Sequence, residues 1–65
     1  MTTVHVIYRH EPDGWWAESP DLVGWSVAGA TFGEVRQLAC EGVAFALGHD
    51  AVVEHQAAAG ERLPA

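Results

Sequence analysis

One segment of the chain carries a helix pattern that is marked at both ends. Thr31 and Glu34 have the spacing of a capping box, in which the hydroxyl caps the first turn and the carboxylate reaches back to it. Apolar residues then recur at the spacing of one helical face, and Gly48 stands where a helix commonly ends. We therefore predict a helix over residues 32–47. Its apolar stripe comprises Phe32, Val35, Ala39, Gly42 or Val43, and Ala46.

The segments on either side of this helix are typical of strands. Residues 3–10 are mostly β-branched or aromatic, a Pro-Asp-Gly turn follows, and we predict further strands over 15–19, 25–30 and 51–56. The order β-β-β-α-β gives an antiparallel meander. A right-handed crossover through the helix then places the last strand beside the first and parallel to it. The predicted fold class is α+β, a four-stranded sheet with one helix on one face.

The chain has 65 residues and fits one small domain, for which we predict residues 1–57 with a short flexible tail at 58–65. A core this small is marginal, and the single cysteine, Cys40, cannot form an internal disulfide. Association with another subunit is the support we expect. We therefore predict a homo-oligomer, a dimer or a larger assembly.

One helix leaves the other face of the sheet uncovered. Trp15 and Trp16 are adjacent in a strand, so their side chains must point to opposite faces. We expect the uncovered face to carry some of three side chains, namely Ile7, one of these two tryptophans, and Trp25. Such an apolar patch calls for a partner.

The charge of the chain indicates which class of partner would bind to this patch. Nine acidic residues stand against three arginines and no lysine, which gives a net charge of −6. Direct binding to nucleic acid or to an anionic membrane is not expected, because both rely on Lys and Arg. A basic protein is the natural complement, although the same charge also serves simply to keep a protein in solution. The predicted partner- or subunit-binding residues are Trp15, Trp16, Trp25, Glu11, Asp13, Glu18 and Asp21.

No catalytic, cofactor or metal site is predicted. Two-metal chemistry needs converging carboxylates, whereas Glu11, Asp13 and Glu18 have the pattern of a solvated rim. Cys40 neighbours a carboxylate in mid-helix and is interpreted as a small hydrophobic filler. None of the four histidines forms a helical i, i+4 pair. His5 and His55 could be neighbours if the first and last strands pair, which would supply two of the four ligands that zinc normally takes.

The N-terminus lacks a basic region followed by an apolar core, and no apolar run approaches the length of a membrane span. With a single thiol, a cytoplasmic location is predicted.

An ordered set of short motifs gives the chain a family resemblance. Pro12-Asp13-Gly14 is followed by an aromatic residue, then come Pro20-Asp21-Leu22-Val23-Gly24 and Gly29-Ala30-Thr31, with an acid three positions on and Ala39 in the helix. In this pattern, which spans about residues 3–56, the chain resembles the N-terminal domain of the HicB antitoxin family. It departs at Val23, Trp25 and Ala30, where the family commonly has Pro, Cys and Asp.

The resemblance implies a partial RNase H-like fold and an antitoxin. It implies as partner a small basic toxin, HicA, a ribonuclease that cleaves mRNA. Family members often add a C-terminal DNA-binding module, but only eight residues follow residue 57. Autoregulation by direct DNA contact is therefore not expected. The alternative is a stand-alone HicB-like oligomeric interaction domain with neither toxin nor catalysis.

Overall fold

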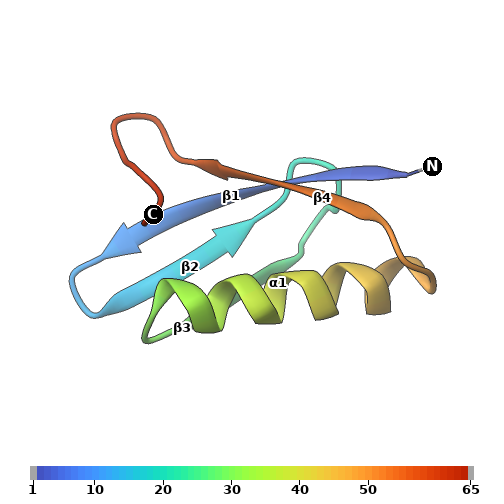
Figure 1. Ribbon diagram of the computed structural model, residues 1–65, viewed down its shortest axis with the longest axis horizontal. Coiled ribbons are helices and arrows are strands. Elements are labelled where there is room, and N and C mark those ends of the chain that lie inside the picture. The colour runs from blue at the N-terminus through green and yellow to red at the C-terminus, as the bar shows by residue number, and fades with distance from the viewer. Residues whose placement is uncertain (1, 65) are drawn as a thin grey trace.

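A computed structural model describes residues 2–64, and its elements follow the predicted order β-β-β-α-β (Figure 1). The strands are β1 (Thr3–Glu11), β2 (Gly14–Glu18), β3 (Ser26–Gly29) and β4 (Val52–Ala57), and the helix is α1 (Phe32–Leu47). The α+β class, the single helix and its bounds are confirmed.

The four strands form one mixed sheet in the order β3-β2-β1-β4. β2 is antiparallel to both β1 and β3, as a meander requires. β4 is parallel to β1, which confirms the crossover expected through the helix. Tyr8 in β1 is opposite Ala17 of β2 and Ala57 of β4, so it lies near the centre of the sheet.

The core lies between α1 and one face of the sheet. Alternate residues of β1 point into it, and Val35, Ala39 and Val43 of α1 meet them with no exposed surface. The core residues on the sheet side are Val4, Val6, Tyr8 and Ala17. The predicted apolar stripe of the helix is wrong at one position. Ala46 is exposed in the last turn, where α1 runs past the end of β2 (Figure 1).

Both ends of α1 are capped where the sequence indicated. The Thr31 hydroxyl accepts a hydrogen bond from the Glu34 amide at 3.1 Å. The Gly48 amide donates to the Ala44 carbonyl at 2.9 Å, and its φ of 76° is a conformation that glycine adopts without strain. The return bond from the Glu34 carboxylate to the Thr31 amide does not form within residues 2–64, so only half of the capping box is present.

After β4 the chain turns back toward β1 (Figure 1). The Ala58 amide donates to the Tyr8 carbonyl at 2.9 Å, and Ala58 is buried. The Glu61 carboxylate accepts from the His10 amide at 3.2 Å, and Leu63 packs against the edge of the core. Part of the segment expected as a tail therefore contacts the sheet.

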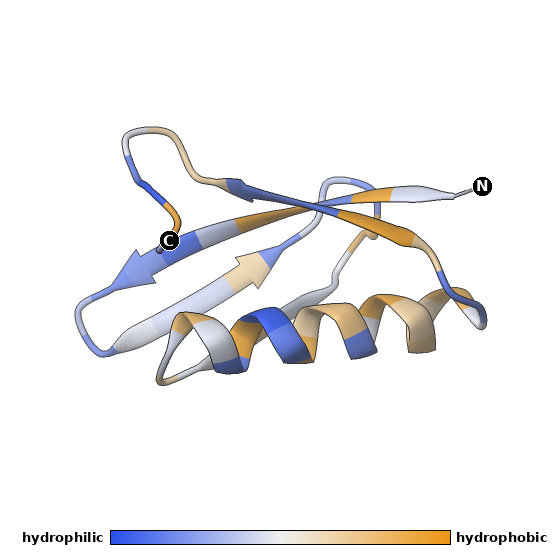
Figure 2. Cartoon of the chain, viewed as in Figure 1, coloured by the Kyte–Doolittle hydropathy of each residue, from blue (hydrophilic) through white to orange (hydrophobic). Residues whose placement is uncertain are grey.

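Hydrophobic residues lie in parts of β1 and α1 and in the first part of β4, whereas the end of β4 and the end of β1 next to the hairpin are hydrophilic (Figure 2). Within residues 2–64, α1 is too short and too polar to cross a membrane.

Candidate functional site

The sheet surface turned away from α1, called here the open face, is the main candidate site. Strand register places Arg9 opposite Trp16, and Ile7 opposite both Glu18 and Gln56. The open face is formed by His5, Ile7, Arg9, Glu11, Trp16, Glu18, Ser26, Ala28, Val52, Glu54 and Gln56. Its side chains are mostly half-buried or exposed, and most of them are polar.

The two adjacent tryptophans point to opposite faces, as predicted. Trp15 lies on the helix side, where it stacks on His10 at 4.3 Å between ring centroids and meets the edge of Phe32 at 5.3 Å. Trp16 lies on the open face. Of this pair, Trp16 is therefore the one free to contact a partner.

Of the side chains considered for the open face, Trp25 does not lie on it. Trp25 has the same strand parity as Val27, which is opposite buried Ala17, and its ring lies on the helix side beside Gly42. A Cβ added at Gly42 would lie 3.1 Å from the Trp25 indole nitrogen. Glycine in mid-helix therefore makes room for this ring, and the cost of about 1 kcal/mol relative to Ala is offset by packing.

Trp16 is the centre of a polar cluster on the open face. Its indole N–H donates to the Glu11 carboxylate at 2.9 Å, and the Arg9 guanidinium lies 5.6 Å from the ring centroid. The Arg9 Nε also pairs with Glu18 at 3.4 Å. We call Arg9, Glu11, Trp16 and Glu18 the Trp16 cluster. It holds a large ring in a fixed orientation with carboxylates on either side.

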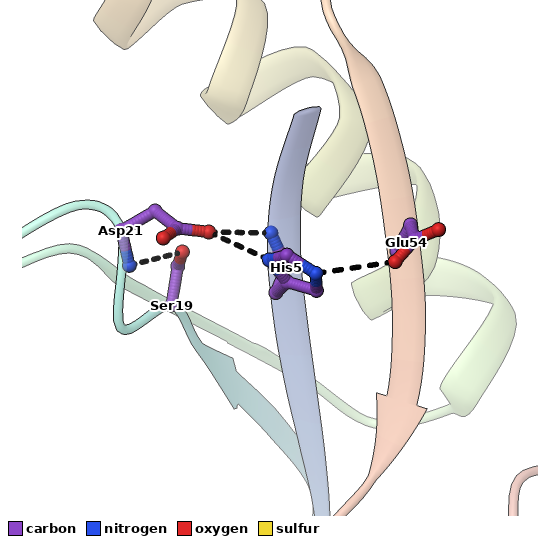
Figure 3. A network of polar contacts seen from close by, with 4 residues as sticks. All are labelled: His5, Ser19, Asp21 and Glu54. Atoms are coloured by element: carbon purple, nitrogen blue, oxygen red, sulfur yellow. Dashed lines mark hydrogen bonds and ion pairs between the residues drawn. The ribbon is translucent and has the colours of Figure 1, made fainter. Parts of the chain in front are cut away.

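A second network joins three segments through His5 (Figure 3). Asp21, in the loop between β2 and β3, accepts from the His5 amide at 2.8 Å and contacts the ring Nδ1 at 3.0 Å. The other ring nitrogen contacts Glu54 of β4 at 3.1 Å. Ser19 accepts from the Asp21 amide at 3.1 Å and so orients the loop. We call His5, Ser19, Asp21 and Glu54 the His5 network.

In this network, the pKa values of His5 and Asp21 shift so as to favour the charged form of each. The hydrogen bond to Asp21, and next the negative charges of Asp21 and Glu54, raise the pKa of His5 above its ordinary value. The hydrogen bonds donated by His5, from its backbone first and its ring second, lower the pKa of Asp21. An imidazole held between two carboxylates favours its protonated form. In that form it is suited to holding the two carboxylates in place rather than to accepting a proton as a general base.

The carboxylates of the candidate set do not converge. Glu11 and Glu18 flank Trp16, Asp21 is held at His5, and Asp13 is exposed in the hairpin turn. The His5 ring separates Asp21 from Glu54, because each contacts a different nitrogen. Within residues 2–64, no group of three His, Cys, Asp or Glu side chains is arranged to hold a metal ion.

On the helix side, the fold brings together three polar side chains whose spacing in the sequence did not suggest a contact. They are Tyr8, His55 and Cys40. The Tyr8 hydroxyl lies 2.6 Å from His55 Nδ1, and the Cys40 Sγ lies 3.9 Å from His55 Nε2. His5 is not a neighbour of His55, because His55 is opposite Val6 and the two rings point to opposite faces. The possible two-histidine zinc pair is therefore excluded by register.

Burial sets the protonation states of Tyr8 and His55. It raises the pKa of Tyr8 to about 12, and it lowers the pKa of His55, with a further contribution from the charge of Arg36. Both side chains are thus neutral near pH 7. A cavity of about 300 Å³ between α1 and β4 reaches Cys40 and His55. The contacts among Tyr8, His55 and Cys40 connect α1 to β1 and β4.

Sequence reasoning missed the partners that complete the open face. His5, Arg9 and Glu54 were not among the candidate binding residues, although strand alternation already placed His5 and Arg9 on the face that carries Ile7. The pairing of His5 with Asp21 and Glu54 depends on register and on the path of the β2–β3 loop, and the pairing of Arg9 with Glu18 depends on register. Neither is encoded in a local pattern.

Comparisons with known proteins returned nothing: no protein-family model matches the chain, and neither any curated protein nor any solved structure matches it significantly.

Proposed function

We propose that this chain is an antitoxin-like protein of a type II toxin–antitoxin system, which binds and occludes a small basic toxin of the HicA type. The observation that carries the proposal is the acidic, tryptophan-bearing open face. Four carboxylates lie on it or at its margin, against one arginine and one histidine. They are Glu11, Glu18, Asp21 and Glu54.

A ribonuclease that cleaves mRNA needs Lys and Arg where its substrate binds. An acidic surface complements that region, speeds encounter and selects for basic partners. The carboxylates of the open face are at least partly exposed, so they can exchange their internal partners for those of a bound protein. Trp16 supplies a large aromatic surface, the side-chain type most enriched at interface hot spots.

The motif resemblance to the HicB family supports the same proposal, and the β-β-β-α-β order is compatible with it. The role proposed is binding without catalysis, in the cytoplasm. Trp15 and Trp25 lie on the helix side, so we now assign them to packing. The proposed binding set is Trp16, Glu11, Glu18 and Asp21, extended by Arg9 and Glu54.

The test is a pull-down with the tagged chain from its native cells at moderate salt, followed by mass measurement of what is retained. We expect a small basic protein in fixed ratio, released by high salt, which is toxic when expressed alone and harmless when this chain is co-expressed. Recovery of this chain alone would contradict the proposal and leave a self-associating interaction domain.

Matched variants locate the surface. Trp16→Ala should weaken the interaction by about tenfold or more, because a buried aromatic anchor typically contributes 2 kcal/mol or more, on the order of the hot-spot threshold. Phe45→Ala is the control, since Phe45 is an equally apolar residue on α1 with 90% of its surface exposed. Equal effects of the two substitutions in folded variants would overturn the assignment of the open face.

A further inference from the structure

The contact between Cys40 and His55 brings together two kinds of metal ligand from different elements. Cys40 lies in α1, and His55 lies in β4, 15 residues further along the chain. The Cys40 Sγ and the His55 Nε2 are 3.9 Å apart. Thiolate sulfur and imidazole nitrogen are both common ligands of transition metals. The fold therefore presents a soft donor and a borderline donor at one point.

The space that a bound ion needs lies beside this pair. The cavity of about 300 Å³ between α1 and β4 is lined by Cys40 and His55, by Asp50, and by four apolar residues. It is partly open to solvent. A small ion can therefore reach both donor atoms from outside, and the cavity leaves room for one further small ligand on that ion.

We propose that Cys40 and His55 bind a soft monovalent metal ion, Cu(I), beside this cavity. The metal forms one bond to the Cys40 Sγ and one to the His55 Nε2. The thiol proton leaves to solvent, and the oxidation state of the metal does not change. A small thiol from solution can occupy a third position on the cavity side. This site lies on the helix side of the sheet, so it goes beyond the proposed binding through the open face, and each proposal can fail without the other.

The distance between the two donor atoms favours a low coordination number. A metal about 2.3 Å from sulfur and about 2.0 Å from nitrogen, with 3.9 Å between those atoms, makes an S–metal–N angle of about 130°. That angle is wider than the tetrahedral angle at structural zinc. Within residues 2–64, no third Cys, His, Asp or Glu side chain completes a metal-binding group. Zinc would therefore lack ligands here, whereas Cu(I), which thiolates select, is stable at low coordination numbers.

His55 is already in the form that a metal requires. Burial, and next the charge of Arg36, lower its pKa, so the ring is neutral near pH 7 and a metal does not compete with a proton for it. The Tyr8 hydroxyl lies 2.6 Å from the other ring nitrogen, Nδ1. When Nε2 binds a metal, Nδ1 carries the ring proton and donates it to the Tyr8 oxygen. Partners of this kind fix the orientation of metal-binding histidines.

Charge favours a monovalent ion over a divalent one. A coordinating thiol is deprotonated, so the Cys40 sulfur neutralises a single positive charge on the metal. Arg36 stands one helical turn before Cys40, and its charge reaches His55. A divalent ion would leave a positive charge near this guanidinium in a half-buried site, which is costly. Asp50 also lines the cavity, but it is exposed, so solvent screens its charge.

The test is an anaerobic titration with Cu(I), in competition with a chromogenic Cu(I) chelator, of the full chain and of two variants. We expect native mass spectrometry to show one Cu(I) bound to one chain. His55→Gln should weaken Cu(I) binding by about tenfold or more, because losing even a group that only supports a metal ligand costs about 10–100-fold. His49→Gln is the matched control, since His49 is exposed and does not line the cavity, and it should leave the affinity unchanged.

A second readout uses the unaltered chain and so does not depend on a variant that folds. Ag(I) has the same charge and ligand preference as Cu(I), and it should shift the ¹⁵N resonance of His55 Nε2 more than those of the other three histidines. A metal ion that bridges two chains through their thiols, a Cu(I) affinity that His55→Gln leaves unchanged, or a His55 ring that Ag(I) does not shift would each overturn the proposal. Zn(II) bound by the same pair as tightly as Cu(I) would overturn the choice of a monovalent ion.

Discussion

At the scale of single residues, the fold gives two of its histidines opposite roles. His5 is held between carboxylates, which raises its pKa, whereas burial lowers the pKa of His55. The stabilisation from His5 is therefore fully present below about pH 6.5 and is lost as pH rises through its raised pKa. Asp21 limits the same contact from the acid side, because its contribution is lost as pH falls through its lowered pKa. The ion pair is strongest between these limits.

An NMR titration checks this assignment. We expect His5 to titrate above about pH 6.5 and His55 below it. Asp21→Asn should move the His5 pKa back toward its ordinary value, and Glu54→Gln should move it less, because Asp21 contributes the largest share. His55, on the other face of the sheet, is the internal reference and should not respond to Asp21→Asn. A His5 pKa insensitive to Asp21→Asn would show that the network in Figure 3 does not form in solution.

At the scale of elements, the cap of α1 is the local interaction with the most predictable effect. Thr31→Ala removes the acceptor of the Glu34 amide and should lower the free energy of unfolding by about 1 kcal/mol. For a domain of this size that corresponds to a fall in melting temperature of about 4–8 °C. Thr31→Ser keeps the hydroxyl and should stay within about 0.5 kcal/mol of the parent in denaturant titrations. Equal losses from both substitutions would attribute the effect to the methyl group of Thr31 instead.

The elements were predictable from sequence because each of their signals is local. The Thr31 and Gly48 caps, the alternation in β1 and the Pro12–Gly14 turn each act over a few residues, and all four form where they were predicted, although the Glu34 half of the capping box does not. The face of Trp25 could not be assigned from sequence, because Trp25 precedes β3 in a loop segment, where its parity could only be judged once the strand start was known. The His5 network and the contact of Cys40 with His55 depend on register across 15 or more residues, beyond the reach of any local pattern.

At the scale of the whole molecule, the net charge sets the sign of the proposed association with a basic protein. The net charge of −6 attracts such a protein to the open face. With a sequence pI of about 4.8, the chain loses its negative charge as the pH is lowered toward that value.

Lowering the pH from about 8 to about 5.5 should therefore weaken the binding of a basic protein to the open face, because the attraction falls as the negative charge of the chain falls. The measurement is fluorescence anisotropy of the labelled partner, with helical circular dichroism confirming an intact fold at both pH values. Binding that is unchanged or tighter at the lower pH would contradict an electrostatic contact through the open face.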